Sequence, residues 1–200
     1  MLKVAVLVSG SGSNLQSILD YGQASFKVEM VIGSKEGIYA LERAKNKNIP
    51  TYVVSKEEYG SEISNKILEL TKNRVDLIVL AGYLKIITPK FVDEFRNKII
   101  NIHPSLIPSF CGKGYYGEKV HQGVIDYGAK VTGATVHFVD EGADTGAIIM
   151  QEAVNVEQDD DAKSLAKRVL EVEHRILKES IRLFCENKLS IQGRRVFINE

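Results

Sequence analysis

The sequence is poor in cysteine, lacks tryptophan and carries no excess of either charge. Its two cysteines, Cys111 and Cys185, are too few for a disulfide framework and do not have the spacing of a metal site. The 26 basic and 26 acidic side chains balance to a formal net charge of zero, so no overall field attracts nucleic acid or an anionic membrane. We therefore expect no nucleic-acid partner, although a local basic pocket remains compatible with this balance.

Long hydrophobic runs are also absent. No apolar stretch approaches the roughly 18 residues that a membrane-spanning helix needs. Residues 1–8 enter a strand-like pattern directly, without the layout of a signal peptide. We therefore expect a cytoplasmic protein with no membrane partner.

What the sequence does contain fits a single α/β domain. Its 200 residues, 44% of them hydrophobic, can form one core. A chain of this length buries roughly 70% of the surface that it exposes when unfolded. No internal repeat and no linker rich in Pro, Gly and Ser marks a domain boundary. We expect one domain over residues 1–200.

Short β-branched runs alternate with helical patterns along the chain, which is typical of βαβ units. Near-continuous apolar runs such as 77–81 suit strands that are covered on both faces. The pattern predicts strands at 2–8, 27–32, 51–54, 76–81, 98–102, 131–139 and 147–154. It predicts helices near 14–21, 38–47, 61–73, 89–96, 118–127 and 162–185. The expected fold is α/β and doubly wound, with a mostly parallel sheet and helices on both faces.

A glycine-rich segment, Ser9–Asn14, lies between the first predicted strand and the first predicted helix. Glycines allow the backbone to approach a ligand closely, and a helix N-terminus offers free N–H groups, so the segment suits a phosphate. The dinucleotide-binding motif does not fit, because Leu15 stands where a third glycine is needed. A Walker motif is also absent. The alternative interpretation is a tight turn with a Ser or Asn helix cap.

Asn101 and His103 stand where a predicted strand ends and a long irregular segment, 103–117, begins. In doubly wound sheets, ligands bind outside the carboxyl ends of the strands. Strand alternation directs both side chains the same way and Ile102 into the core. An amide and an imidazole placed together can stabilise an oxyanion and move a proton. The alternative is a structural histidine hydrogen-bonded to the loop, although irregular segments of this length are usually functional.

The segment Val139–Gly146 is expected to be an acidic turn between two strands. Acids and glycines often serve only to shape such a turn. Thr135 and His137, however, share one face of the strand before it and are directed toward the same end as the acidic loop. These residues form a second candidate site segment.

Glu173 falls in the apolar stripe of the last predicted helix, between Val169 and Ile176. An unpaired buried carboxylate is costly, so Glu173 should have a partner or face a site. The alternative is a Glu at the edge of the stripe whose carboxylate reaches solvent.

Taken together, these segments resemble the phosphoribosylglycinamide formyltransferase family of folate-dependent enzymes. The resemblance runs over essentially the whole chain and rests on segments 8–16, 80–89, 100–108, 135–139 and 144–146. The sequence Asn-Ile-His-Pro-Ser-Leu-Ile-Pro at 101–108 is highly specific for folate-dependent formyl chemistry in general. The glycine loop and the short length narrow the resemblance to this family.

The resemblance implies a role for each segment. It implies Asn101, His103 and Asp144 as the catalytic residues, with Thr135 and His137 in support. It implies that the substrate phosphate and ribonucleotide contact Gly12, Ser13, Asn14 and Glu173. The residues bordering the folate would be Leu84, Lys85, Ile86, Ile87, Asn101, Asp140, Glu141, Gly142, Ala143 and Asp144. Residues 1–100 would then form a phosphate-binding half, and residues 101–200 a catalytic and folate-binding half.

The reaction implied by the resemblance belongs to purine biosynthesis. A formyl group passes from the cosubstrate 10-formyltetrahydrofolate to the amine of N1-(5-phosphoribosyl)glycinamide, with no metal. Protonated His103 and the Asn101 amide would donate to the developing oxyanion. Asp144 would raise the pKa of His103 and favour the imidazolium. The expected partners are small molecules, and the protein is expected to be a monomer or a homodimer.

The sequence departs from the family pattern in two places. An Arg that assists the folate tail is expected near 56–59, and this chain has none there. Lys56 or Lys85 could supply the charge, without the bidentate geometry of Arg. The loop 110–117 is also longer than the family form, and His121 is expected to correspond to the family's loop histidine.

Three other functions are alternatives to this one. A hydrolase of 10-formyltetrahydrofolate shares the Asn, His and Asp, but its family carries an N-terminal regulatory domain that we do not expect here. An initiator methionyl-tRNA formyltransferase would need a further C-terminal domain and a basic surface. A non-catalytic nucleotide-binding module would use the glycine loop and leave Asn101, His103 and Asp144 unexplained.

Overall fold

The computed structural model describes residues 1–22 and 25–199, which divide into two compact units, Met1–Asn101 and Ile102–Glu200. The elements of the first unit are β1 (Leu2–Val8), α1 (Ser13–Leu19), β2 (Phe26–Gly33), α2 (Tyr39–Lys45), β3 (Thr51–Val53), α3 (Lys56–Tyr59), the 3-10 helix η1 (Gly60–Glu62), α4 (Ile63–Thr71), β4 (Leu77–Leu80), α5 (Pro89–Glu94) and β5 (Ile99–His103). Strand β5 runs across the boundary into the second unit.

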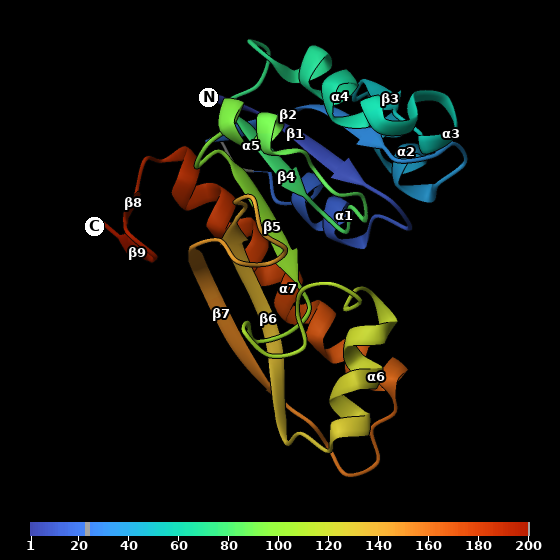
Figure 1. The fold of residues 1–200 in the computed structure, drawn as a ribbon, viewed down its shortest axis with the longest axis vertical. Coiled ribbons are helices and arrows are strands. Elements are labelled where there is room, and N and C mark those ends of the chain that lie inside the picture. The colour runs from blue at the N-terminus through green and yellow to red at the C-terminus, as the bar shows by residue number, and fades with distance from the viewer. Residues whose placement is uncertain (23–24, 200) are drawn as a thin grey trace. The chain divides into compact units, whose positions relative to one another are not determined.

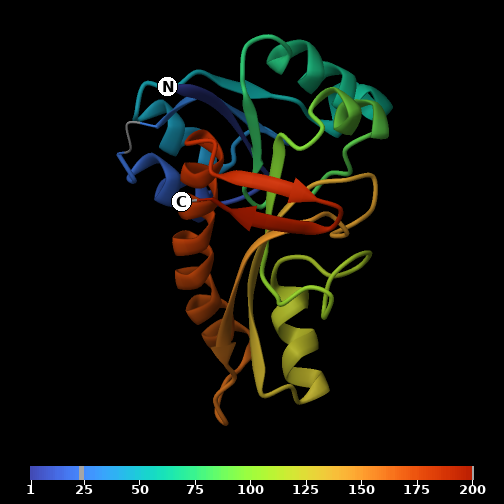
Figure 2. The same cartoon turned by 90° about the vertical axis from the view of Figure 1, so that its left-hand side faces the viewer.

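The strands of the first unit form a parallel sheet in the order β3-β2-β1-β4-β5. Strand β1 lies at its centre, where Val6 pairs with Val31 on one side and Val79 on the other. Residues 4–8 are fully buried, as expected for an apolar strand in a sheet covered on both faces. Helices α1 and α2 contact each other, and α4 contacts α3 and α5. These two groups lie on opposite sides of the strands (Figures 1 and 2).

The second unit contains α6 (Glu118–Tyr127), β6 (Val131–Phe138), β7 (Ile148–Asn155), α7 (Ala162–Cys185), β8 (Leu189–Gln192) and β9 (Arg195–Ile198). Its strands follow the order β6-β7-β9-β8, in which β6 and β7 are antiparallel, β7 and β9 parallel, and β8 and β9 antiparallel. Helix α7 runs alongside β6 and β7 and contacts both (Figure 2).

Helix α7 begins and packs as its sequence dictates. The Asp161 carboxylate accepts from the N–H groups of Lys163 and Ser164, and the Ser164 hydroxyl accepts from the N–H of Asp161. This capping box satisfies N–H groups that the helix itself leaves free. The predicted apolar stripe is buried, namely Leu165, Val169, Val172, Ile176 and Ile181. Glu173 is buried with it, at 7% exposure.

The predicted α/β class, with its mostly parallel sheet, is confirmed, and the predicted helices and strands all form with small changes at their ends. The short α3 and η1 and the β8–β9 hairpin were not predicted. The hairpin turns through Gly193 in a left-handed conformation, between the paired residues Gln192 and Arg195. Among the described residues, no helix is both long and apolar enough to cross a bilayer.

Candidate active site

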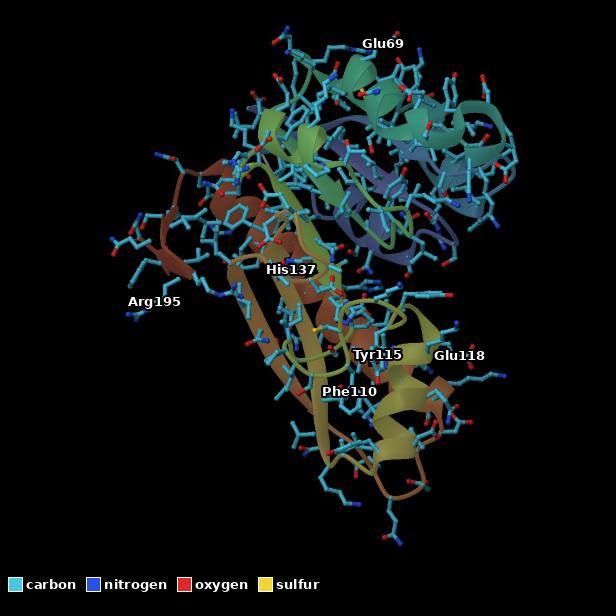
Figure 3. All side chains as sticks on the ribbon, in the orientation of Figure 1. Glu69, Phe110, Tyr115, Glu118, His137 and Arg195 are labelled. Atoms are coloured by element: carbon cyan, nitrogen blue, oxygen red, sulfur yellow. The ribbon has the colours of Figure 1, made fainter. Side chains whose placement is uncertain are left out.

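Two histidines and one aspartate meet in the second unit. His103 Nδ1 lies 3.6 Å from Asp144 Oδ2, and His137 Nε2 lies 3.6 Å from Asp144 Oδ1. Both histidines are almost fully buried, and the Asp144 side chain is 16% exposed. The expectation that His103 and Asp144 lie close together is confirmed. Figure 3 labels His137 on β6.

The acidic turn carries Asp144 on a hydrogen-bonded backbone. Asp144 has a φ of 59°, in the left-handed region. Asp140 Oδ1 accepts hydrogen bonds from the Gly142 N–H at 3.1 Å and from the Thr145 hydroxyl at 2.5 Å. At Gly146 an added Cβ would lie 1.7 Å from the Phe138 carbonyl oxygen, so only glycine fits there. These residues therefore shape the turn that carries Asp144, as the structural interpretation of this segment expects.

The irregular segment after β5 contributes backbone groups to the site. His103 Nε2 lies 2.9 Å from the Phe110 carbonyl oxygen, and Gly112 N–H donates to Asp144 Oδ2 at 2.9 Å. Because a carbonyl only accepts, Nε2 must carry the proton that joins it to Phe110. In neutral His103, Nδ1 then has a free electron pair on the side of Asp144. The loop contact that the structural interpretation of His103 expects is therefore present, and the ring also lies beside the Asp144 carboxylate.

Thr135 supports this loop from β6. Its buried hydroxyl donates to the Ser105 carbonyl at 2.6 Å and accepts from the Ile107 N–H at 3.1 Å. Gln151 on β7 donates to the Ile107 carbonyl and to the Thr135 hydroxyl, both at 2.9 Å. The supporting role expected for Thr135 is thus structural, because it holds the chain that follows His103.

The pKa of His103 differs from the sequence-based expectation. Burial lowers the pKa of His103, and this effect outweighs the Asp144 charge and the Phe110 carbonyl, which both raise it. The charge of His137 lowers it further. Asp144 therefore raises the pKa of His103 as expected, but burial outweighs it, so the expectation of a favoured imidazolium was wrong. The neutral imidazole is favoured, because moving a charged ring out of water is costly.

Asp144 is held as an anion. Burial by itself would raise the pKa of the Asp144 carboxyl. The His137 side chain, the His103 charge and the Gly112 N–H outweigh burial, so that the pKa is lowered. A neutral imidazole nitrogen beside a fixed carboxylate is a proton-accepting pair, because the anion stabilises the imidazolium once it forms.

His121 on α6 is a further buried histidine, at 4% exposure. Its Nδ1 atom has no hydrogen-bond partner in the described part of the chain. Burial, together with the charge of His103, lowers the pKa of His121 to about 4, so the ring is neutral near pH 7. The residues alone gave no signal for His121, which only the family resemblance pointed out.

In the glycine loop of the first unit, the alternative of a Ser or Asn helix cap was wrong, because the cap residue is Gly12 and no side chain caps the helix. Gly12 caps α1 with a φ of 74°, and an added Cβ would lie 2.6 Å from the Cβ of Ala40. Gly12 thus makes room for α2, whereas Gly10 faces open space. Arg43 binds the loop, because its Nε donates to the Ser11 carbonyl at 2.9 Å.

The loop after β4 joins the glycine loop. Leu84 N–H donates to the Ser9 hydroxyl at 3.0 Å, so segments that follow the neighbouring strands β1 and β4 are linked. Leu84 is 57% exposed and Ile86 is 94% exposed. Apolar side chains left in solvent beside a loop of this kind suit an apolar ligand surface.

Ser13 and Asn14 open α1, and Asn14 is buried. Asn101 is half-buried on β5, two residues before His103 and on the same side of the strand. Among the described residues, no group of His, Cys, Asp and Glu could hold a metal ion.

Comparison with known proteins decides the family, because the formyl transferase family matches residues 2–181. The chain belongs to the formyl transferase family. Phosphoribosylglycinamide formyltransferase of Haemophilus influenzae is 39% identical over 205 residues, which cover 100% of this chain and 94% of that protein. The crystal structure of glycinamide ribonucleotide transformylase 1 from Symbiobacterium toebii superposes with a TM-score of 0.93 at 41% identity, covering 100% of this chain and 95% of that one.

Some relatives of this formyl transferase are longer. It is 42% identical over 193 residues to the chloroplastic phosphoribosylglycinamide formyltransferase of Vigna unguiculata, and the match covers 94% of this chain but 62% of that protein. A formyltetrahydrofolate deformylase of Pseudomonas syringae superposes with a TM-score of 0.89 at 24% identity, covering 100% of this chain and 66% of that one. This last likeness shows a shared fold alone.

Sequence reasoning missed three sets of contacts in this formyl transferase. They are the backbone groups of Phe110 and Gly112 at the histidine–aspartate pair, Gln151 beneath the loop, and Arg43 at the glycine loop. None has a local sequence signal, because each joins residues that only the folded chain brings together. In the sequence, only the length of the loop 110–117 indicated that this loop has a function.

Proposed function

We propose that this formyl transferase moves the formyl group of 10-formyltetrahydrofolate to the amine of N1-(5-phosphoribosyl)glycinamide, in purine biosynthesis. The observation that carries the proposal is the buried pair of His103 and Asp144 at 3.6 Å, in a chain whose relatives over its full length bear this name. Transfer of a formyl group between two amines needs a group that takes a proton and returns it. This pair is built for that task.

In the proposed reaction, the neutral amine attacks the formyl carbon on N10 of the folate. The tetrahedral intermediate then carries a negative oxygen and a positive nitrogen. The Asn101 amide donates to the oxygen, a contact of a kind worth about 2.7–4 kcal/mol in other enzymes. His103 Nδ1 takes the proton from the attacking nitrogen, and Asp144 stabilises the imidazolium.

The same proton completes the reaction. His103 passes it to N10 as the bond between the formyl carbon and N10 breaks, which releases tetrahydrofolate and leaves the N-formyl product. The catalyst is thereby returned to its neutral form, and atoms and charges balance. The lowered pKa of His103 suits this order of events, because the ring must be neutral when it receives the proton.

The remaining site residues are proposed on the family resemblance together with their surroundings. Gly12, Ser13 and Asn14 would contact the substrate phosphate, and Glu173 the ribonucleotide. Residues 84–87 and 140–144 would border the folate, and the exposure of Leu84 and Ile86 supports this for the first segment. The substrates are small molecules, and we infer a cytoplasmic protein that needs no metal.

The experiment is an assay of tetrahydrofolate release from 10-formyltetrahydrofolate, with and without the ribonucleotide. The proposal expects release only when the ribonucleotide is present, in amounts equal to the N-formyl product. Release into water at the same rate without the acceptor would instead identify a hydrolase. Absence of release under both conditions would contradict both enzymatic functions.

A further inference from the structure

The long loop 110–117 is folded against α6 through aromatic rings. The Phe110 ring makes edge contacts with the Tyr115 ring, at a centroid distance of 6.0 Å, and with the Tyr127 ring at 5.8 Å. Both interplanar angles are 77°, which is a favourable arrangement for aromatic pairs. Figure 3 labels Phe110 and Tyr115 beside α6.

Gly123 on α6 makes room for these rings. A Cβ added there would lie 3.0 Å from Tyr115 Cε1 and 3.5 Å from Phe110 Cδ1. A methyl group at this position would press on the Tyr115 ring first. Helix and loop are thus packed closely at Gly123, so that an added methyl group would displace the Tyr115 ring by a few tenths of an ångström.

The Phe110 backbone needs such support. Its φ of 49° lies in the left-handed region, which a bulky residue avoids unless its surroundings hold it there. This conformation aims the Phe110 carbonyl into the site, where it accepts from His103 Nε2 at 2.9 Å and from the Ser105 hydroxyl at 3.3 Å. The Phe110 ring that packs against the other rings and the carbonyl that binds His103 thus belong to a single residue.

We propose that Tyr115 is a positioning residue for catalysis, and that Tyr115 and Phe110 form a clasp on Gly123 that keeps the Phe110 carbonyl on His103 Nε2. The clasp thereby fixes the tautomer of His103 and leaves Nδ1 free to take a proton. This inference rests on the proposed function of His103. It assigns a task to the long loop that neither the family resemblance nor the catalytic residues explain.

The titratable groups that face His103 belong to the same unit as His103 itself. They are Asp144 after β6, His137 on β6 and His121 on α6. The carboxylate favours a proton on Nδ1, whereas the Phe110 carbonyl favours one on Nε2. Loss of the carbonyl would let the neutral ring exchange between its two tautomers, with Nδ1 donating to Asp144 in part of the population.

The first test is Gly123→Ala, with Gln122→Ala on the exposed side of the same helix as the matched control. Alanine favours the helix more than glycine does, so the urea midpoint should stay the same or rise. The kcat should nevertheless fall about threefold or more, since small misplacements of reacting groups are costly. The acid limb of kcat/KM should move to lower pH, because a contact that raises the pKa of His103 is weakened.

The second test compares Tyr115→Ala with Tyr115→Phe. The alanine variant should lose about tenfold in kcat with little change in either KM. The phenylalanine variant keeps the ring and should restore most of the activity. Nitrogen NMR of the four histidines should show neutral His103 with its proton on Nε2 in the wild type and mixed tautomers in Tyr115→Ala.

Normal turnover and an unchanged His103 tautomer in Tyr115→Ala would overturn the clasp. So would equal losses in Tyr115→Ala and Tyr115→Phe, or an activity loss in Gly123→Ala matched by a fall in the urea midpoint. These outcomes leave the proposed function standing, because the wild type still transfers the formyl group. A wild type with no transfer would contradict the proposed function, and the NMR comparison would still decide whether the rings control the tautomer.

Discussion

His103 lies between two acceptors, and this position decides what it can do. The Phe110 carbonyl binds Nε2, and the Asp144 carboxylate lies beside Nδ1. The sequence motif predicts a histidine that serves as an acid, whereas burial favours a neutral ring that serves first as a base. The proposed reaction thus keeps the predicted role of His103 in proton transfer but begins with the ring in the other protonation state.

Asp144→Asn tests the electrostatic part of this arrangement. The carboxylate raises the pKa of His103, so its removal should lower that pKa further. The acid limb of kcat/KM should therefore move to lower pH, and kcat should fall about 10–100-fold because the imidazolium is less stable. Steady-state kinetics from pH 5 to pH 9 would show both effects. An unchanged profile with a raised folate KM would mean that Asp144 only binds the cosubstrate.

Gly10→Ala tests the phosphate role of the glycine loop at one residue. An added Cβ at Gly10 meets nothing within 4 Å, so the fold should be unaffected, whereas Gly12→Ala would press on Ala40 and destabilise the unit. If the loop contacts the substrate phosphate, the methyl group should raise the KM for the ribonucleotide severalfold and leave the KM for the folate unchanged. Equal changes in both constants, with normal thermal stability, would remove the phosphate from this loop.

At the scale of elements, the sequence is informative wherever a pattern is local. The helix α7 could be predicted because its apolar residues recur at helical spacing, and β1 and β4 because their apolar runs are continuous. The β8–β9 hairpin was missed although Gly193 marks its turn, since strands of four residues give a weak alternation signal. The conformation of the loop 110–117 could not be predicted at all, because it depends on contacts with α6 and the acidic turn.

The N-terminal cap of α7 can be tested by Asp161→Ala, with Asp159→Ala as the exposed control. Asp161 caps the helix, whereas Asp159 lies outside the cap. The cap variant should lower the melting temperature by about 2–4 °C and the control by less. Backbone N–H groups lower the pKa of Asp161, so the stabilisation is present above the ordinary carboxyl pKa and is lost as the pH falls through the lowered value. Equal melting temperatures for both variants at pH 7 would contradict the cap.

At the scale of the whole molecule, the sequence predicted the fold class and the position of the candidate site segments along the chain. It did not predict the contacts that the residues of these segments make. The site segments could be located because they follow predicted strands, where parallel sheets place ligands. The contacts of Gly112 and Arg43 could not, because each joins residues 32 positions apart in the chain, and that of Phe110 could not, because it depends on the fold of an irregular loop. The chain belongs to the formyl transferase family, and the proposed function assigns these segments to one reaction.

The most direct measurement is the transfer of isotope-labelled formyl carbon to the ribonucleotide by the wild type and by His103→Ala, followed by mass spectrometry of the product. We expect the wild type to place the label on the glycinamide amine, and the folded variant to do so at least about 10²-fold more slowly. Circular dichroism of the variant would establish that it keeps the fold. A folded His103→Ala protein that transfers the label at nearly the wild-type rate would contradict the proposed role of the His103–Asp144 pair.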